Sequence, residues 1–259
     1  MSYSLKVLYS GSTGNAAVLC AGDTAVLIDA GRSARALCCA LGQAGISPDA
    51  IKAVFLTHEH SDHTAALEVF LKHHPVPVHA AGASADRMAA RAGEHLRAAL
   101  VTHSPLFTES IGDLTLTSFR TSHDSAESIG FRIQVREEGQ IHTIGYATDL
   151  GVVTPAVEEG LCGCEAVVLE CNHDEEMLMT GPYPYDLKRR IASRRGHLSN
   201  PDCAVFSARL AAKGMKRLLL AHLSETNNLP ELALSEVRAA LAGTGVHIAV
   251  ASPTDVVEL

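Results

Sequence analysis

Three histidines and an aspartate lie within the segment Thr57-His58-Glu59-His60-Ser61-Asp62-His63. The apolar run 53–56 before it is typical of a buried strand, and residues 65–71 after it are typical of a helix. The segment is therefore expected on a strand-to-helix loop. Imidazole is the commonest protein metal ligand and adds nothing to turn propensity, so this density favours metal binding over a histidine-rich surface loop.

The spacing within this segment separates the side chains into two sets. His58 and His60 alternate off the end of a strand toward one side. Asp62 and His63 enter the following helix and reach a second position. One short stretch of chain could therefore serve two metal ions.

Polar residues follow other predicted strands as well. His123 comes after strand 114–119, Asp149 after strand 141–147, and His222 after strand 217–221. An α/β scaffold gathers its active site at such strand ends. Each oxygen of a carboxylate can bind one cation, which makes Asp149 a candidate bridge. The remaining histidines without ligand spacing are expected to be ordinary surface or core residues: His73, His74, His79, His95 and His103.

The histidine segment resembles the His-x-His-x-Asp-His signature of the metallo-β-lactamase superfamily. This resemblance implies an α/β fold, the αββα sandwich of two mixed sheets flanked by helices. It also implies two divalent metal ions, the first held by His58, His60 and His123, the second by Asp62, His63 and His222, with Asp149 as the bridge. Asp29, in Asp29-Ala30-Gly31, is similar to the family's first motif and is expected to support the metal loop rather than bind metal.

The stretch Ser10-Gly11-Ser12-Thr13-Gly14-Asn15 lies between two predicted strands. Its two glycines would allow close backbone approach to a ligand, but a glycine-rich hairpin turn would look the same. The stretch also resembles the opening of one bacterial branch of the superfamily. That resemblance favours function and makes Ser12 and Asn15 candidate substrate contacts.

Length and composition favour one domain spanning residues 1–259, because 47% of the 259 residues are hydrophobic and no linker or low-complexity tract interrupts the chain. The N-terminal residues lack a signal-peptide pattern, and no apolar run approaches the roughly 20 residues that span a bilayer. Seven cysteines without framework spacing fit reduced thiols, and Cys162 and Cys164 are expected to be small buried residues. These features predict a cytoplasmic protein without membrane contact.

Two divalent cations side by side lower the pKa of a bound water from about 16 toward 7, so hydrolysis is the expected reaction. The scaffold alone does not choose between phosphodiesters, thioesters and lactones. Asp62 and Asp149 are expected to be catalytic as well as metal-binding. Zinc suits the histidines, while the carboxylate ligands also suit manganese, and iron is possible.

Gly196-His197-Leu198-Ser199-Asn200 resembles the phosphate-contacting histidine motif of nucleic-acid-processing relatives such as the RNase J and β-CASP enzymes. This favours phosphodiesters and gives His197 a catalytic role on the substrate, either donating to the phosphoryl oxygens or protonating the leaving oxygen. His173, Ser199 and Asn200 become candidate substrate contacts. Ser199 or Asn200 could also cap a helix 201–212 that begins with Pro201, and both interpretations can hold together.

A basic run directly precedes this motif and includes Arg190 and Arg194. If residues 186–195 are helical, these two arginines lie on one face, where a phosphate backbone would relieve the repulsion between them. The alternative is a solvated basic face. A local patch is needed because the net charge of −8 does not attract nucleic acid to the surface as a whole.

Together the motifs resemble those of the bacterial YycJ/WalJ family, 5′ to 3′ DNA exonucleases linked to repair. The predicted function is a di-metal nuclease with DNA as its substrate. One alternative is a phosphodiesterase acting on a small cyclic nucleotide or sugar phosphate at the same site. Another is a non-catalytic metal-binding regulatory protein, which a complete ligand set disfavours. The sequence leaves the oligomeric state open.

Overall fold

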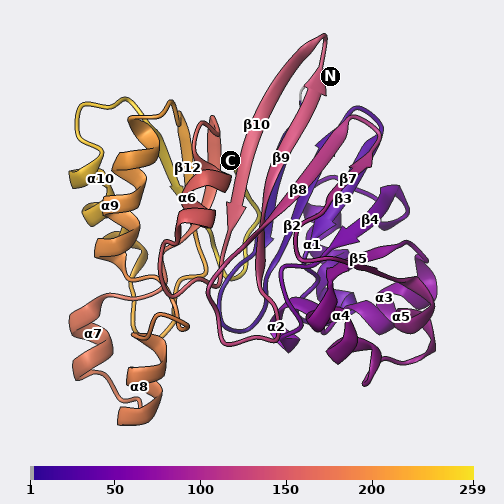
Figure 1. The fold of residues 1–259 in the computed structure, drawn as a ribbon, viewed down its shortest axis with the longest axis horizontal. Coiled ribbons are helices and arrows are strands. Elements are labelled where there is room, and N and C mark those ends of the chain that lie inside the picture. Colours follow the sequence, from indigo (N-terminus) through magenta and orange to yellow (C-terminus); the bar gives the residue numbers. More distant parts are fainter. Residues whose placement is uncertain (1–2) are drawn as a thin grey trace.

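A computed structural model describes residues 3–259, which form two seven-stranded sheets packed face to face (Figure 1). The strands of the first sheet lie in the order β14 (Val257–Glu258), β1 (Ser4–Tyr9), β2 (Ala16–Ala21), β3 (Thr24–Ile28), β4 (Ile51–Phe55), β5 (Val78–Ala81) and β6 (Leu100–His103). The second sheet has the order β13 (His247–Val250), β12 (Arg217–Ala221), β11 (Ala166–Glu170), β10 (Gln140–Ala147), β9 (Ile129–Glu137), β8 (Leu114–Arg120) and β7 (Thr108–Ile111).

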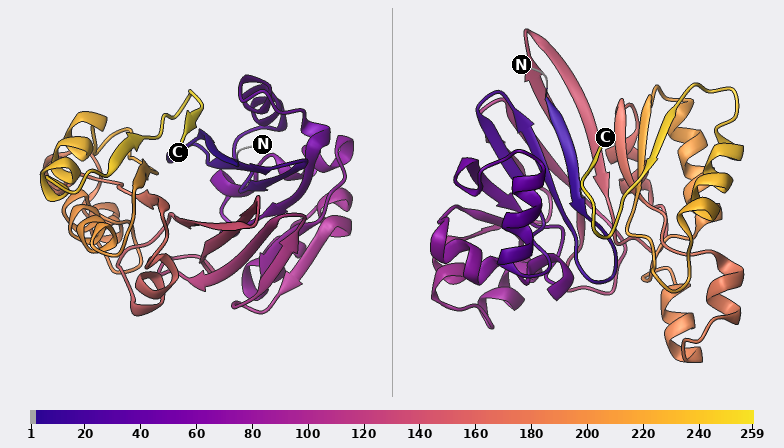
Figure 2. Two further views of the ribbon diagram at one scale, coloured as in Figure 1. Left: turned by 90° about the horizontal axis from the view of Figure 1, so that it is seen from above. Right: turned by 180° about the vertical axis from the view of Figure 1, so that it is seen from behind.

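Helices cover the outer face of each sheet, which gives four layers (Figures 1 and 2). The first sheet carries α1 (Ala34–Gln43), α3 (Leu67–His73), α4 (Gly82–Ala89) and α5 (Glu94–Ala99), together with the short α2 (Ser61–Thr64) and a 3₁₀ turn at Pro48–Ala50. The second sheet carries α6 (Pro155–Leu161), α9 (Asn200–Ala211) and α10 (Pro230–Ala240). The two remaining helices, α7 (Glu175–Thr180) and α8 (Tyr185–Ile191), project at one end of the sandwich.

The central strands are buried on both faces. In β3, Val26 and Ile28 pack between the two sheets, while Ala25 and Leu27 pack against the helical layer. Such strands form continuous apolar runs in the sequence because neither face meets water. Three apolar layers result, one between the sheets and one under each set of helices, and the predicted αββα sandwich is confirmed.

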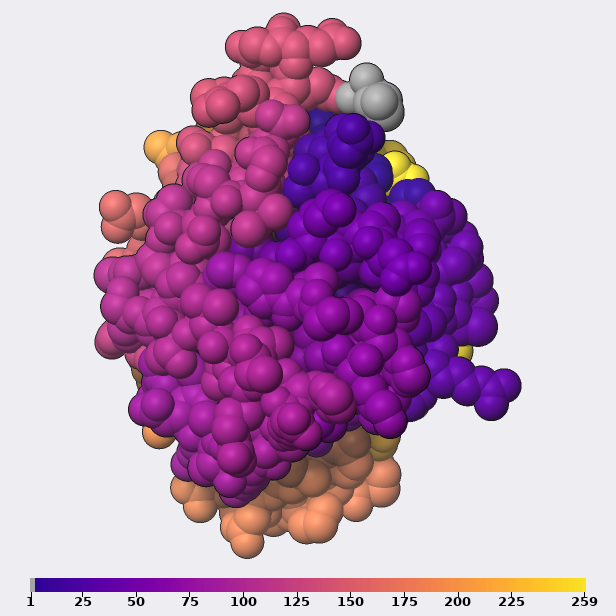
Figure 3. Space-filling model, turned by 90° about the vertical axis from the view of Figure 1, so that its right-hand side faces the viewer, coloured from indigo at the N-terminus to yellow at the C-terminus, as the bar shows by residue number. Residues whose placement is uncertain are grey.

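The two ends of the sandwich differ. The β9–β10 hairpin extends at one end, and α7 and α8 lie at the other, as the side view of the N-terminal half also shows (Figure 3). Strands β3, β4 and β5 run parallel, as do β10, β11 and β12, so within each group the carboxyl ends meet at the same edge of the sheet. The polar segments that follow these strands can therefore gather in one place.

The helix predicted at 65–71 is instead two helices, α2 and α3, because tertiary hydrogen bonds replace helical ones at the break. The carbonyl of Asp62 accepts from the Asn15 N–H at 2.8 Å, and the Ala66 N–H donates to the Ala30 carbonyl at 2.9 Å. The break thus ties the histidine loop to two neighbouring loops.

Two other boundaries differ from prediction. Residues 75–79 are apolar enough to predict a strand, but β5 begins only at Val78, because prolines at positions 75 and 77 have no N–H to donate to a neighbouring strand. The helix expected at 186–195 ends at Ile191, where the chain folds back so that the His197 N–H bonds the Ile191 carbonyl at 2.9 Å. Arg190 and Arg194 therefore do not share a helical face, and that prediction is wrong.

Among residues 3–259, no helix has the length and apolar character needed to cross a membrane.

Candidate metal centre

The structure brings together all seven side chains that the sequence predicted as metal ligands. They come from segments that follow β4, β8, β10 and β12. His58, His60 and His123 offer ligand atoms within 4.8 Å of one another, and so do Asp62, His63 and His222. A third group of the same kind, formed by His58, His63 and Asp149, connects the first two.

The carboxylate of Asp149 lies between the two histidine groups. Its Oδ2 is 3.3 Å from His63 Nε2, and its Oδ1 is 3.4 Å from His222 Nε2 and 3.7 Å from His123 Nε2. Asp62 Oδ2 lies 3.3 Å from His63 Nε2. The geometry therefore places Asp149 where a bridging ligand would be needed.

Each of four histidine rings is oriented by a partner on its Nδ1 atom. These partners are Thr57 Oγ1 for His58 (3.1 Å), Asp29 Oδ2 for His63 (2.8 Å), the Gly196 carbonyl for His123 (3.0 Å) and Glu170 Oε1 for His222 (3.1 Å). A partner on Nδ1 fixes the ring and leaves Nε2 to face the centre. Asp29 also accepts from the Thr57 N–H at 2.8 Å, so it supports the loop in the position predicted.

Several atoms that face the centre have no hydrogen-bond partner although they are buried. Among the described residues these include His58 Nε2, His222 Nε2 and Asp149 Oδ2. Leaving a buried polar atom unpaired costs about 1–3 kcal/mol. Converging imidazole nitrogens and carboxylate oxygens are a donor set that zinc, manganese or iron would satisfy, so the residues present fit divalent metal ions.

The charge of the centre also calls for cations. Asp29, Asp149 and Glu170 are buried, and Asp62 is mostly so, which gives four negative charges. Two divalent ions would carry four positive charges and balance them. In the protein alone two of the histidines, His63 and His222, take up protons instead. Burial lowers the pKa of His222, but Asp149, Asp62 and Glu170 outweigh it and raise that pKa to about 10.

The backbone is strained at this centre. Asp29, Asp149 and His222 have positive φ angles of 61°, 55° and 57°, a conformation that non-glycine residues rarely adopt. Each such residue costs on the order of 1–3 kcal/mol and marks a functional site when the surroundings enforce it. Asp29 and His222 directly follow β3 and β12, and Asp149 lies two residues after β10, so the left-handed conformation occurs where the chain leaves a strand.

A pair formed by Glu170 and His197 borders the centre. Glu170 is fully buried at the end of β11, and its Oε1 lies 2.7 Å from His197 Nδ1, while its Oε2 accepts from the Leu150 and Leu198 N–H groups at 2.8 and 3.2 Å. The carboxylate fixes the His197 ring and leaves Nε2 available. Sequence reasoning missed Glu170; its only signal was a charged residue ending the apolar run Val167–Leu169.

The loop 10–15 approaches other parts of the chain closely. A Cβ atom on Gly14 would lie 2.3 Å from the Arg32 side chain, and the Asn15 carbonyl accepts from the Gly31 N–H at 2.9 Å. Asn15 is buried, with Nδ2 3.2 Å from His63 Nε2, whereas Ser12 is exposed. The glycines thus allow the loop to pack on the metal loop, and the burial of Asn15 does not favour its predicted contact with substrate.

The other predicted substrate contacts differ in exposure. Asn200 is buried and hydrogen-bonded to Asn228, which does not favour a contact with substrate. Ser199 caps α9, its Oγ accepting from the Asp202 N–H at 3.3 Å, as one interpretation of the sequence predicted. His173 is buried, and burial lowers its pKa to about 4, so it is neutral at pH 7. With His197 and Ser199 it lines a cavity of about 240 Å³.

The two arginines of the basic run lie in different surroundings. Arg190 forms an ion pair with Asp124 and remains half exposed. Arg194 is exposed, and its carbonyl accepts from Ser122 Oγ at 2.8 Å. All seven cysteines are free thiols, with Cys164 buried in the core under α6 and Cys162 partly buried.

Comparison with known proteins agrees with this geometry. Residues 24–223 match a family model described as a beta-lactamase superfamily domain. The chain is 34% identical over 253 residues to exodeoxyribonuclease YycJ of Bacillus anthracis, covering 96% of this chain and 92% of that protein. It is 30% identical over 258 residues to exodeoxyribonuclease WalJ of Streptococcus pneumoniae, covering 96% and 94%.

Solved structures share the fold at lower identity. The metallo-beta-lactamase fold protein YhfI from Bacillus subtilis aligns with a TM-score of 0.74 at 18% identity, over 99% of both chains. The short form of human tRNase Z aligns with a TM-score of 0.65 at 17% identity, over 98% of both. By its sequence matches and its two-sheet architecture, this chain belongs to the metallo-β-lactamase superfamily and, within it, to the YycJ/WalJ family.

Proposed function

We propose that this protein is a metal-dependent phosphodiester hydrolase, and specifically a 5′ to 3′ DNA exonuclease that acts in DNA repair. The observation that carries the proposal is the convergence of unpaired donor atoms beside the Glu170–His197 pair. Relatives of 34% and 30% identity that are named exodeoxyribonucleases, aligned over nearly their whole length, support DNA as the substrate.

His58, His60 and His123 would hold one divalent ion, and Asp62, His63 and His222 a second, with Asp149 between them. Zinc and manganese both suit this mixture of imidazole and carboxylate donors, and iron is a further option. Two such ions lower the pKa of water and polarise the phosphoryl group under attack. The chain's own contribution is to fix the ligands from behind, through Asp29, Thr57, Glu170 and the Gly196 carbonyl.

His197 would act on the substrate. Glu170 holds its Nδ1, which leaves Nε2 to donate to a phosphoryl oxygen or to protonate the leaving oxygen. The side chain keeps 17% of its surface exposed, whereas the side chains of His63, His123 and His222 are at most 3% exposed, so a substrate can reach it. Ser12 and Ser199 remain predicted substrate contacts, and neutral His173 could accept a hydrogen bond in the adjoining cavity.

We also propose that residues 1–259 act as one domain, because both sheets supply residues to the centre. The seven free cysteines support action in a reducing compartment, the cytoplasm.

The test uses protein purified without chelator, with its metals measured by elemental analysis. Single-stranded oligonucleotides labelled at either end are compared with bis(p-nitrophenyl) phosphate and with cyclic nucleotides. The proposal expects mononucleotides released from the 5′ end and about two metal ions per chain. Hydrolysis of the cyclic nucleotides with intact oligonucleotides would instead identify a small-molecule phosphodiesterase.

A further inference from the structure

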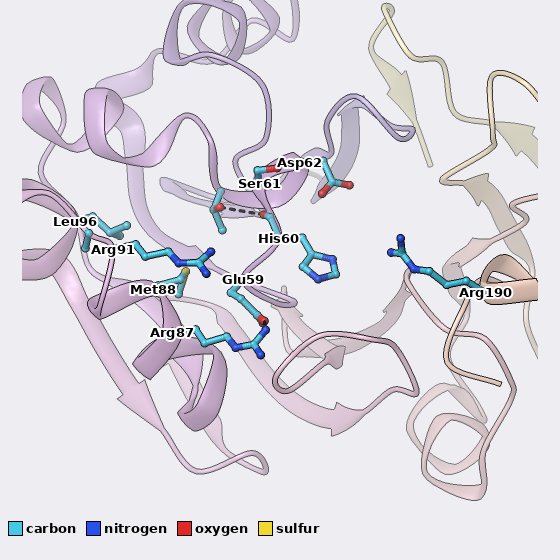
Figure 4. A pocket seen from close by; sticks show the side chains of 11 residues that line it. Glu59, His60, Ser61, Asp62, Arg87, Met88, Arg91, Leu96 and Arg190 are labelled. Atoms are coloured by element: carbon cyan, nitrogen blue, oxygen red, sulfur yellow. Dashed lines mark hydrogen bonds and ion pairs between the residues drawn. The ribbon is translucent and has the colours of Figure 1, made fainter. Parts of the chain in front are cut away.

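A cavity of about 550 Å³ opens beside the metal centre, between the histidine loop and α4 (Figure 4). His60 and Asp62 form the wall toward the centre, Arg87 and Arg91 line the far side, and Arg190 reaches in from the second sheet's side of the molecule. The volume is within the range of about 300–1,000 Å³ that is usual for ligand sites. A ligand here could touch the predicted metal ligands and three guanidinium groups together.

Two of the three arginines are paired with carboxylates, Arg190 with Asp124 and Arg87 with Glu59, and the third is not. Arg87 bonds the buried carboxylate of Glu59 through Nη1 at 3.1 Å, but that carboxylate also accepts from Ser84 Oγ and from the Ala126 N–H, and 61% of the Arg87 side chain is exposed. Among residues 3–259, no hydrogen bond or ion pair involves the Arg91 guanidinium. Each arginine has five N–H donors, so most of these donors remain free for a ligand.

The placement of these cations is informative because the chain as a whole carries a net charge of −8. Arg87 lies in the last turn of α4, Arg91 lies two residues beyond its end, and both line the cavity, so their like charges repel. An anion between them removes the repulsion, and guanidinium groups pair with phosphate through two parallel hydrogen bonds. Glu59 and Asp62 also line the cavity, but Glu59 is already paired with Arg87, so the unpaired Arg91 and the free donors of Arg87 are what suit this side of the cavity to a phosphate.

The rest of the lining combines three polar residues, Glu59, Ser61 and Thr64, with an apolar surface. Met88 and Leu96 present side chains that are nearly buried yet border the cavity, and Ala92 lies between them in sequence. No Phe or Tyr is among the lining residues. A sugar or base can lie on this surface without the stacking and base-edge hydrogen bonds that select sequence.

We propose that this cavity holds the nucleotide next to the scissile phosphate of a single DNA strand, with Arg91 and Arg87 on its phosphate and Met88 and Leu96 under its sugar and base. The inference rests on the proposed nuclease function and adds where the strand runs. His58 and His222 are buried, so the reacting phosphate must enter a recess beside the cavity, which one strand can do more readily than a duplex. Binding is independent of sequence.

The test compares Arg91→Ala, Arg91→Lys and the matched control Arg238→Ala, which removes an exposed arginine on α10, the helix that covers the opposite sheet. Each is assayed on a thymidine oligonucleotide and on the p-nitrophenyl ester of thymidine 5′-phosphate. The ester has only the scissile phosphodiester and no neighbouring phosphate. Metal content is measured for every variant.

For Arg91→Ala we expect kcat/KM on the oligonucleotide to fall about tenfold. On the ester kcat/KM should fall by about twofold or less, because the ester has no neighbouring phosphate for Arg91 to bind. The log-log salt dependence of oligonucleotide binding should lose about 0.7 of its slope. Arg91→Lys should recover part of the loss, and Arg238→Ala should match the wild type on both substrates.

Two results would overturn the inference and leave the nuclease function standing. In the first, the wild type is active and Arg91→Ala has the same kcat/KM on the oligonucleotide as Arg238→Ala. In the second, Arg91→Ala loses activity equally on both substrates and also loses metal. A wild type that cleaves the ester but no oligonucleotide would overturn the proposed function, and this inference with it.

Discussion

Two groups of histidines in this structure have ligand atoms within 4.8 Å of one another, yet they are built differently. In the metal centre four of the five rings are held from behind at Nδ1, and the Nε2 atoms of His58 and His222 face the centre without a hydrogen-bond partner. In the second group, His79 and His103 with Glu109, the two rings bond each other, His79 Nδ1 to His103 Nε2 at 2.9 Å. The two groups therefore differ in what holds the rings: oxygen atoms of other residues in the metal centre, and another imidazole in the second group.

The surroundings of the second group are aromatic rather than acidic. Phe55, His79, His103 and Phe107 form a stack in which neighbouring ring planes differ by 11°, 20° and 12°. His103 is the last residue of β6 and Phe107 directly precedes β7, so the stack lies where the chain passes from the first sheet to the second. We therefore expect the second group not to bind a metal ion, because its one carboxylate, Glu109, neither orients the rings nor matches the charge of a divalent cation.

The most damaging change to the metal centre should be Asp149→Ala. It removes the one carboxylate that reaches both histidine groups, so we expect hydrolysis to be abolished and metal content to fall. Glu109→Ala is the matched change in the second group and should alter neither property. Elemental analysis and an assay on bis(p-nitrophenyl) phosphate measure both. A folded Asp149→Ala protein that keeps two metals and normal turnover would show that the di-metal assignment is wrong.

His197→Ala should reduce turnover by about 10²–10⁴. The reason is that His197 is proposed to contact the substrate while Glu170 occupies its Nδ1. Metal content should stay at the wild-type value, which distinguishes this variant from Asp149→Ala. If His197→Ala loses an ion, His197 is a ligand and not a proton donor.

Glu170→Gln should have a smaller and mixed effect, because Glu170 touches no substrate and acts through His197 and His222. Removing a carboxylate behind a ligating histidine typically costs 10- to 100-fold in metal affinity. We expect that loss in a metal titration, together with a pH profile for turnover shifted from the wild type. An unchanged affinity and profile would mean that the Glu170 contacts are only structural.

The metal ligands were predictable from the sequence because they lie in a local motif or closely follow strands with strong apolar patterns. The same patterns placed β4 and β12, whose residues are mostly buried on both faces. Glu170 was not predictable in its role, since its contacts with His197 and His222 join residues 27 and 52 positions apart. A single sequence carries no sign of such pairs.

Boundaries failed where tertiary contacts override local preference. The break between α2 and α3 depends on Asn15 and Ala30, which lie in other loops. The early end of α8 depends on the fold-back at Gly196, where a Cβ would lie 2.0 Å from the Ile191 carbonyl. The cavity arginines Arg87 and Arg91 were missed for a similar reason, because nothing near them in the sequence shows that α4 faces the histidine loop.

Metal binding should release protons from the metal centre at pH 7. Nearby carboxylates outweigh burial and raise the pKa of both His63 and His222, the latter to about 10, so these rings are protonated when metal-free. A metal ion must displace those protons, and its affinity should therefore rise with pH, about tenfold per unit for each proton released. Calorimetric titration in two buffers of different ionisation enthalpy counts the protons. No release at pH 7 would contradict this assignment of charge.

The smallest effect on activity is expected from His103→Phe, in the second group. Phenylalanine can keep the stack with Phe107 but leaves His79 Nδ1 unpaired in a buried position, which costs about 1–3 kcal/mol of folding free energy. The exposed His73, changed to Phe, is the control and should leave stability nearly unchanged. Denaturant unfolding measures the difference, while turnover and metal content should equal the wild-type values in both variants. Because burial and the neighbouring His103 lower the pKa of His79, that ring is neutral when folded at pH 7. If His103→Phe instead lowers metal content by one equivalent, the second group is itself a metal site, and the contact between its two rings does not prevent metal binding.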